Sequence, residues 1–168
     1  MPKIIENLPQ RLLDEARRQV EESGYSAMTI RTVAKGCGVG VGTVYNYYPS
    51  KEALVATFML TDWNNCIAAI QSCADESDTV EPVLKAIHSS LKLFLQQFAP
   101  IFRDADAAAS YGGALSKYHS ILRNQLAAPI RKFCRDDFTA EFIAEAMLTW
   151  TGAGKDFDEL KEVLLRIS

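Results

Sequence analysis

The chain has 168 residues, a formal net charge of −3 at pH 7 and four cysteines. This length is sufficient for one or two small domains with a hydrophobic core of useful size. No run of eighteen apolar residues and no basic-then-apolar leader occurs, so we expect neither a membrane span nor secretion. The cysteines lack metal-ligand spacing, which favours reduced thiols in the cytoplasm and predicts no metal site and no cofactor.

Charge is distributed unevenly along the chain. Residues 1–56 hold seven Lys and Arg against six Asp and Glu, whereas the remainder holds eleven against fifteen. The acidic pI of about 5.4 therefore does not exclude an N-terminal region that binds nucleic acid. Few cations are available there to displace counterions from DNA, so weak non-specific affinity is expected. Such a region needs two copies to bind well.

Two helices are predicted at the start of the chain. The first covers about residues 8–23, and its inward-facing apolar positions are Leu12, Leu13, Ala16 and Val20. Thr29 is a natural N-cap for the second helix, which has an apolar stripe at Ile30, Val33 and Ala34. Gly36 and Gly38 end this helix, because glycine accepts the left-handed backbone that a sharp turn requires.

A third helix is expected over residues 42–48, and it is too short to be stable alone. Pro49 ends it, since the residue before a proline is pushed out of helical space. Three of its last four residues are tyrosines, which favours a helix whose rings meet a partner. Two short helices joined by a glycine turn form a helix-turn-helix unit, whose second helix lies in the DNA major groove.

The run from Gly24 to Leu54 carries a family pattern. Its residues are Gly24-Tyr25, Thr29, Val33-Ala34, Gly38-Val39, Gly42-Thr43-Val44-Tyr45, Tyr48 and Pro49-Ser50-Lys51-Glu52-Ala53-Leu54. With this spacing, residues 8–56 resemble the N-terminal domain of the TetR family of bacterial transcriptional regulators. The resemblance implies an all-α protein. A three-helix DNA-binding domain is expected over residues 1–50, and a helical effector-binding and dimerisation domain over residues 51–168.

The resemblance also implies which side chains meet DNA. Thr29 and Arg31 are expected to contact phosphates or bases from the helix before the turn. The base-facing positions of the recognition helix are Val41, Gly42, Thr43 and Asn46. The expected phosphate or sugar clamps are Tyr45, Tyr48 and Lys51, and Tyr47 suits either role. Because valine and glycine side chains donate no hydrogen bond, indirect or water-mediated readout is expected to contribute.

Some of these positions depart from the family pattern or have a simpler interpretation. Gly40 stands where the family often has Ser or Thr as a helix cap, which costs only a few tenths of a kcal/mol. Tyr48 stands where Phe is common, which would turn a core-facing ring into one with a hydroxyl near the backbone. Tyr45 is equally consistent with a ring tucked against the first helix, and Lys51 with a solvated side chain.

The rest of the chain reads as helices, with no strand pattern. Helices are expected over about residues 50–73, 80–98 and 114–133, with Pro100 after the second and a bend at Pro129 in the third. Gly112-Gly113 is expected to break the Ala-rich segment between them. Two further helices are predicted, over about residues 139–151 and after a capping box of Asp156 and Glu159.

The last two helices are the expected dimer surface. Their wide apolar faces carry Phe142, Ala146, Met147, Trp150, Leu160 and Leu164. In the family that the chain resembles, two C-terminal helices pair with their twins as a four-helix bundle. A two-fold dimer would set the recognition helices roughly 34–36 Å apart and would read a near-palindrome.

An effector pocket is the least defined prediction. Aromatic residues suited to line it are Trp63, Phe94, Phe98 and Tyr118, although core packing or surface placement explains each as well. The mainly apolar lining favours a small, uncharged or lipophilic effector. His88 reads as a hydrogen-bonded histidine rather than a ligand, and Asp104, Asp106 and His119 make a poor metal site.

Three functions from different classes are compatible with the sequence. The leading one is a dimeric repressor that binds a palindromic operator and is released by a small molecule, with DNA and effector opposing each other. The second keeps the DNA-binding domain but makes the helical body a protein-interaction module without a small ligand. An enzyme comes a distant third, because no nucleophile–base pair, metal cluster or close carboxylate pair stands out.

Overall fold

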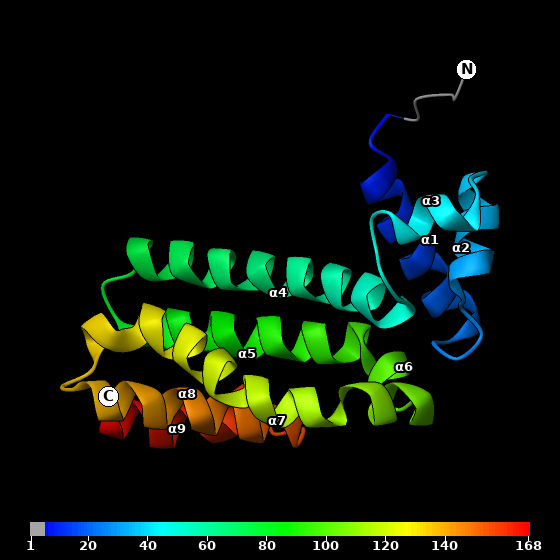
Figure 1. Ribbon diagram of the computed structural model, residues 1–168. Helices are drawn as coiled ribbons and strands as arrows, with labels where there is room; N and C mark the ends of the chain where they lie inside the picture. Colours follow the sequence, from blue (N-terminus) through cyan, green and yellow to red (C-terminus); the bar gives the residue numbers. More distant parts are fainter. Residues whose placement is uncertain (1–5) are drawn as a thin grey trace. The chain divides into compact units, whose positions relative to one another are not determined.

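The computed structural model describes residues 6–168, and within them the side chains of residues 112–117 are not described. The described part of the chain contains no strand, which confirms the all-α prediction. Its helices, labelled in Figure 1, are α1 Leu8–Ser23, α2 Ile30–Cys37, α3 Val41–Tyr45, α4 Lys51–Glu76, α5 Val80–Gln97, α6 Ala99–Phe102, α7 Ala105–Ala127, the 3-10 segment η1 Ala128–Phe133, α8 Asp137–Gly152 and α9 Phe157–Ile167.

Packing divides the chain into two compact units. The first unit contains the chain up to Thr61 together with Phe98–Gly112, and the second contains Asp62–Gln97 together with Gly113–Ser168. The chain therefore passes into the second unit inside α4, returns to the first between α5 and α6, and passes into the second again inside α7. Consequently α6 and the first turns of α7 pack with the N-terminal helices, although they follow them by more than forty residues in the sequence.

The first unit confirms the local predictions for α1 and α2. Helix α1 begins at Leu8 and ends at Ser23 as expected, and Leu12 and Ala16 on its inner face are fully buried. The Thr29 side chain caps α2 by accepting from the Thr32 N–H at 3.1 Å, while the Thr32 hydroxyl accepts from the Thr29 N–H at 3.0 Å. Gly38 ends α2 with a φ of 69°, a left-handed conformation that glycine adopts without strain.

The recognition helix is shorter than predicted. Helix α3 covers Val41–Tyr45, whereas the sequence predicted residues 42–48. Gly40 is its N-cap and offers no side-chain bond, so the helix starts without a capping oxygen. Asn46 and Tyr47 form a turn after it, and Pro49 keeps Tyr48, the residue before it, out of helical geometry. So short a helix depends on its neighbours for stability, and the fully buried Val44 supplies that contact.

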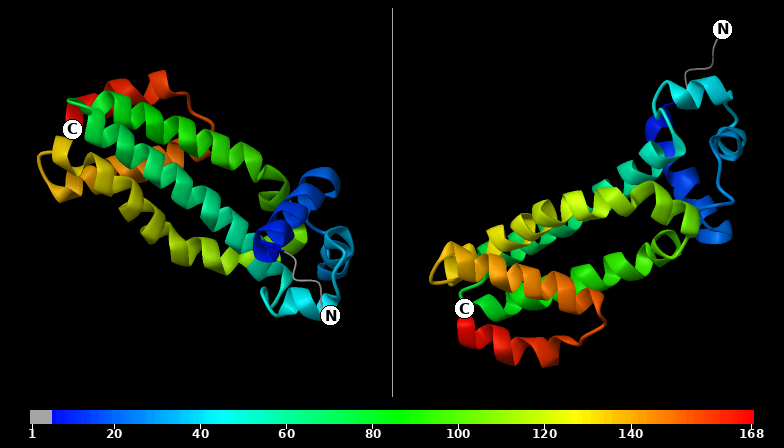
Figure 2. Two further views of the ribbon diagram at one scale, coloured as in Figure 1. Left: turned by 90° about the horizontal axis from the view of Figure 1, so that it is seen from above. Right: turned by 60° about the horizontal axis from the view of Figure 1, so that its bottom comes forward.

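In the second unit, α5 packs against α8 and α9. Figure 1 shows the three helices side by side, and Figure 2 shows the same arrangement from two further directions. Their core contains the fully buried Leu84, Ile87 and Ile143. His88 is buried in this unit, with its Nε2 atom 2.9 Å from the Lys155 carbonyl, as expected of a hydrogen-bonded histidine.

Several predicted boundaries in this part of the chain are wrong. Helix α7 runs without interruption from Ala105 to Ala127, so Gly112-Gly113 does not break it. A glycine inside a helix costs about 1 kcal/mol relative to alanine, which the helix formers around it offset. Pro100 follows the end of α5 at Gln97, as expected, and it lies in the first turn of α6, where its missing N–H removes no helical bond.

Helix caps set the start of the last two helices. Asp136 accepts from the Thr139 N–H at 2.7 Å, so α8 begins at Asp137, two residues before the predicted start. Asp156 and Glu159 form a capping box at α9, which confirms the prediction from their spacing.

Within the described residues, α4 alone is long and apolar enough to cross a membrane, judged by length and composition. A buried helix of a globular protein passes the same test. In α4, Leu54, Phe58 and Trp63 are buried within the protein, and Asp62 accepts a hydrogen bond from the Gln97 side chain at 2.7 Å. Its apolar character is thus weak evidence for a membrane span.

Candidate nucleic-acid interface

The recognition helix buries one residue and exposes the side chains expected to read DNA. Val44 is fully buried, whereas Val41 is 36% exposed and Tyr45 is 51% exposed. Gly42 and Asn46 are exposed as well, and Thr43 is half-buried. A Tyr45 side chain with this exposed fraction is not tucked against α1. The interpretation of Tyr45 as a DNA-contact residue is the one that remains. Tyr47, 48% exposed, lies in the turn after the helix.

Tyr48 lies in the core rather than on the DNA-facing surface. The side chain is only 8% exposed, and its hydroxyl donates to the Pro9 carbonyl at 3.2 Å. Burial raises the pKa of this phenol. The prediction that Tyr48 clamps phosphate therefore needs correction. Its ring occupies the core position where the family commonly has Phe, and its hydroxyl fastens the start of α1.

Lys51 is held by the turn that precedes α2. Its Nζ atom donates to the Tyr25 carbonyl at 2.6 Å and lies 3.9 Å from the centre of the Tyr25 ring. Burial lowers the pKa of Lys51, and the nearby carboxylates of Asp104 and Glu52 oppose this shift. A cation at the start of a helix is disfavoured by the helix dipole, and the Tyr25 contacts explain it without DNA. The predicted phosphate contact thus has a competing partner within the protein.

Helix α2 contributes charge to the same region. Arg31 is exposed in its first turn and Lys35 in its last, whereas α3 itself carries no charged residue. The Thr29 hydroxyl caps α2 by accepting from the Thr32 N–H, and it donates to the Thr32 hydroxyl at 3.3 Å, so it has partners within the protein for both roles. The surface therefore combines two cations with hydroxyl, amide and ring groups.

The sequence did not indicate the bond that joins α1 to α2. The Thr32 hydroxyl donates to the Gln19 side-chain oxygen at 2.5 Å, and Gln19 in turn donates to Glu15 at 2.6 Å. A capping box is usually recognised from Glu or Gln three residues after the cap. Here Thr32 takes that place, so a search for T-x-x-T is the pattern that finds it.

The four residues expected to line an effector pocket do not share one environment. Trp63 is buried, with its Nε1 donating to Gln125 at 2.7 Å and its ring edge-to-face with Phe94 at 5.4 Å. Phe98 belongs to the first unit and stacks on Phe58 at 6.0 Å. Tyr118 is 51% exposed. Trp63 and Phe98 therefore already have partners within the protein. The prediction that the four residues line one effector pocket is not supported.

The predicted dimer surface divides into core and surface residues. Met147, Leu160 and Leu164 are buried in the core of the second unit, so their assignment to the interface is wrong. Their helices bury them against their own chain. Ala146 is half-buried against the same core. Phe142 and Trp150 are 52% and 49% exposed, as a partner-facing side chain requires.

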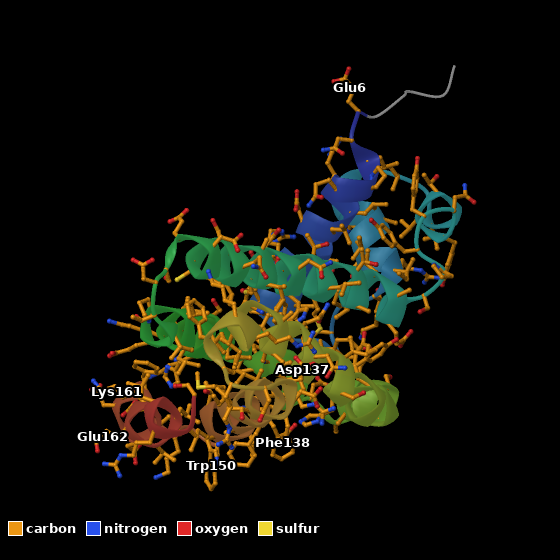
Figure 3. The ribbon with its side chains drawn as sticks, turned by 90° about the vertical axis from the view of Figure 1, so that its left-hand side faces the viewer. Glu6, Asp137, Phe138, Trp150, Lys161 and Glu162 are labelled. Atoms are coloured by element: carbon orange, nitrogen blue, oxygen red, sulfur yellow. The ribbon has the colours of Figure 1, made fainter. Side chains whose placement is uncertain are left out.

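Two further exposed apolar residues lie on the same helices. Phe138, which precedes the predicted start of its helix, is 73% exposed at the start of α8, and Val163, on the expected apolar face of the last helix, is 60% exposed. Figure 3 shows Phe138 and Trp150 projecting outward from the molecule. The Phe138 ring lies 6.4 Å from that of Phe142. We call Phe138, Phe142, Trp150 and Val163 the C-terminal apolar surface. Helical spacing alone did not separate these residues from the core face.

Helix α3 is short and exposed, and it follows α2 after a glycine turn. Two helices in this arrangement form a helix-turn-helix motif. The family model described as "Bacterial regulatory proteins, tetR family" matches residues 12–57. The match covers most of α1, all of α2 and α3 and the start of α4, so this part of the chain is similar to TetR-family regulators.

Curated relatives match part of the chain. The transcriptional regulator UidR of Escherichia coli K12 is 28% identical over 79 residues, which cover 47% of this chain and 40% of UidR. The repressor KstR of Rhodococcus jostii is 35% identical over 54 residues, or 32% of this chain and 26% of KstR. The chain thus spans less than half the length of these relatives.

Solved structures match over nearly the whole chain. The regulator SCO7518 of Streptomyces coelicolor has a TM-score of 0.70 at 14% identity, covering 94% of this chain and 95% of the other. FadR of Thermus thermophilus, a TetR-family repressor solved with lauroyl-CoA, has a TM-score of 0.61 at 21% identity, covering 94% and 91%. At such identities the likeness establishes the fold alone.

Proposed function

We propose that the protein is a transcriptional repressor that binds a near-palindromic operator in double-stranded DNA as a homodimer in the cytoplasm. The observation that carries the proposal is the exposed outer side of α3 within a TetR-family DNA-binding domain. Val44 anchors that helix, and its other side chains are left to meet a partner. The named curated relatives are transcriptional regulators, which supports the same function and not an enzyme.

The exposed groups suit a division of labour on DNA. Asn46 and Thr43 offer an amide and a hydroxyl to base edges, and the methyl groups of Val41 and Thr43 suit contact with thymine. The backbone at Gly42 is open for close approach, because a Cβ there would meet no atom within 4 Å. Tyr45 and Tyr47 suit phosphate and sugar contacts, and Arg31 adds charge.

Dimerisation is proposed through the C-terminal apolar surface. Large apolar side chains exposed together on one face are typical of protein–protein contacts. Isologous pairing of α8 and α9 with their twins would bury Phe142 and Trp150. Two recognition helices would then lie about one DNA turn apart. With few cations per domain, the second copy is needed for useful affinity.

Selection of bound duplexes from a randomised pool at low salt tests this function. We expect enrichment of a near-palindrome with half-sites about ten base pairs apart. The Trp150→Asp variant, analysed in parallel, separates the contribution of the dimer from that of the single domain. Absence of any enriched sequence, from folded and dimeric protein, would reject sequence-specific DNA binding.

Release by a small, mainly apolar effector completes the proposal. FadR of Thermus thermophilus was solved with lauroyl-CoA and FadR of Bacillus subtilis with stearoyl-CoA. An effector that binds the DNA-free state more tightly must lower operator affinity, and operator DNA must lower effector affinity by the same factor. Titration of the operator complex with acyl-CoA of graded chain length checks both halves of this relation.

The alternative is a helical body that binds another protein without a small ligand. The observation in its favour is that Gln125 and Phe94 already occupy the surroundings of Trp63. Leu93, 65% exposed on α5, adds an apolar side chain for such a partner. If acyl-CoA neither shifts the melting temperature nor releases DNA, this alternative is preferred.

A further inference from the structure

The turn between α1 and α2 is fastened to the start of α7, far away in the sequence. Ser26 in this turn donates its backbone N–H to Asp104 Oδ2 at 3.2 Å. Its hydroxyl oxygen lies 2.7 Å from the same Oδ2 atom and 2.9 Å from a carboxylate oxygen of Asp106. All of these residues belong to the first packed unit. The contact therefore joins parts of one body, across 78 residues of sequence.

Both carboxylate oxygens of Asp104 lie near the Ser26 hydroxyl, at 3.0 Å for Oδ1 and 2.7 Å for Oδ2, but they accept from different backbone N–H groups. Oδ1 accepts from the backbone N–H groups of Asp106 and Ala107, at 3.0 and 3.1 Å, and so caps α7. Oδ2 accepts from the Ser26 N–H. These hydrogen bonds, first the one from the Ser26 hydroxyl, hold the pKa of Asp104 below its usual value, so the carboxylate stays ionised at neutral pH. A cap alone needs one oxygen, and the second is used for the turn.

A pair of tyrosines reinforces the same connection. Tyr25, next to Ser26, is 1% exposed, and its ring meets that of Tyr111 edge-to-face at 6.1 Å. The Tyr111 hydroxyl donates to the Glu52 carbonyl at 2.9 Å, at the start of α4. The Tyr25 carbonyl is also the acceptor for Lys51. The turn is therefore held by contacts with the start of α4 and with the first turns of α7.

The turn leads directly into the helices that would read DNA. Thr29, three residues after Ser26, is the N-cap of α2, and α2 packs against α3. Holding the backbone of Ser26 thus restricts where α2 begins and, through α2, where α3 lies. The turn is otherwise exposed at Ser26 and Ala27, so little packing fixes it at these residues.

We infer that Asp104 is a positioning residue for DNA recognition, because its Oδ2 atom ties the backbone of the turn before α2 to the start of α7. This inference rests on the proposed function and names a residue that acts on it through the turn.

Asp104→Ser isolates this role in the full-length chain. Serine keeps one capping oxygen for α7 but removes the oxygen that reaches the Ser26 N–H. Asp136→Ser is the matched control, because Asp136 caps α8 in the second unit through the same kind of bond, to Thr139. Both changes remove one negative charge. Ser26→Ala, combined with Asp104→Ser, tests whether the two residues act through one contact.

Amide hydrogen exchange across residues 25–48 in the free protein is the first readout, and operator affinity is the second. We expect Asp104→Ser to speed exchange in this segment and to weaken operator binding roughly three- to tenfold, as loss of one or two hydrogen bonds implies. Asp136→Ser should change neither quantity, even where both variants lose equal melting temperature. Adding Ser26→Ala should cost little further.

Unchanged exchange over residues 25–48 in Asp104→Ser would overturn the inference, as would equal effects of the two serine variants on operator affinity. A wild-type chain that binds no DNA would reject the proposed function instead. In that case the exchange experiment still decides whether Asp104 positions the turn.

Discussion

The two units of the protein differ in what they leave exposed. In the first unit, Tyr45, Tyr47 and Asn46 face outward beside a single buried anchor, Val44. In the second unit the outward groups include Phe138, Phe142 and Trp150, which lack charge and offer at most one hydrogen-bond donor. Hydrogen-bonding groups suit a polar, hydrated partner such as DNA. Exposed aromatic rings suit the surface of another protein.

Under the proposed function, this difference explains how an acidic chain with few cations would bind DNA. Pairing of two chains through the C-terminal apolar surface would link two N-terminal domains, and linked sites bind with a high effective concentration. Each unit would then depend on the other. Substitutions directed at one unit should therefore produce effects that distinguish association from recognition.

The largest effect is expected from Trp150→Asp on the C-terminal apolar surface. A carboxylate buried without a partner at the interface should weaken dimerisation roughly a hundredfold or more. Operator affinity should fall with it, while the monomer stays folded, because Trp150 is 49% exposed. Sedimentation velocity across a concentration series measures the association constant. Leu93→Asp is the control, since Leu93 is an exposed apolar residue on α5. Equal dimerisation of both variants would remove this surface from the interface.

The next effect compares two valines of the recognition helix. Val44→Ala deletes a fully buried side chain and should lower the free energy of unfolding by about 2 kcal/mol. Val41→Ala, at a position 36% exposed, should change it by less than about 0.5 kcal/mol. Urea denaturation followed by circular dichroism measures both. A larger loss of stability for Val41→Ala would mean that α3 presents the opposite side.

Asn46→Ala should alter sequence preference. Loss of an amide that reads a base edge costs about 1–3 kcal/mol of discrimination at one base pair of each half-site. Tyr45→Phe, which removes only a hydroxyl, is expected to weaken binding to all duplexes alike. Competition of single-base operator variants against the selected duplex measures these effects. If Asn46→Ala weakens every duplex equally, Asn46 contacts the backbone.

The smallest effect concerns alkaline pH and the first unit. Burial raises the pKa of Tyr25, Tyr48 and Tyr111, so these phenols stay protonated in the folded chain. The unfolded chain loses these protons above a pH of about 10, and there the folded state binds more protons than the unfolded state. Stability should therefore fall as pH rises beyond this value.

The lowered pKa of Lys51 acts in the opposite direction, since the folded chain releases that proton earlier. The three phenols should outweigh the single amine. Urea denaturation at several alkaline pH values, with ultraviolet titration of the phenolate groups, checks the sign. Stability that rises with pH in this range would contradict the burial of these rings.

The sequence predicted the first unit well where local chemistry decides the structure. The Thr29 cap and the left-handed turn at Gly38 are each determined by one or two residues, whereas α3 ends at Tyr45, before the predicted end at residue 48. The partners of Tyr48 and Lys51 within the protein, Pro9 and Tyr25, lie far from them in the chain and were not predicted. Asp104 was not assigned to this unit at all, since only the folded chain brings it to Ser26.

In the second unit, helical periodicity identified the apolar faces of the helices but not which of their residues are buried within the chain. Helix α8 is apolar on more than one side, so Met147 and Trp150, three residues apart, read alike although one is buried and the other exposed. The same ambiguity affected Leu160 and Leu164 on α9. Periodicity indicates that a residue prefers burial. It does not indicate whether the residue is buried by its own chain or by a second copy.

Titration of the full-length chain against the selected duplex, by fluorescence anisotropy, tests the central claim most directly. Three duplexes are compared at two salt concentrations: the palindrome, a single half-site and a scrambled sequence. We predict two chains per palindrome and an affinity well above that for the half-site, with the scrambled duplex bound weakly and lost first as salt rises. Equal affinity for all three duplexes at both salt concentrations would contradict the account.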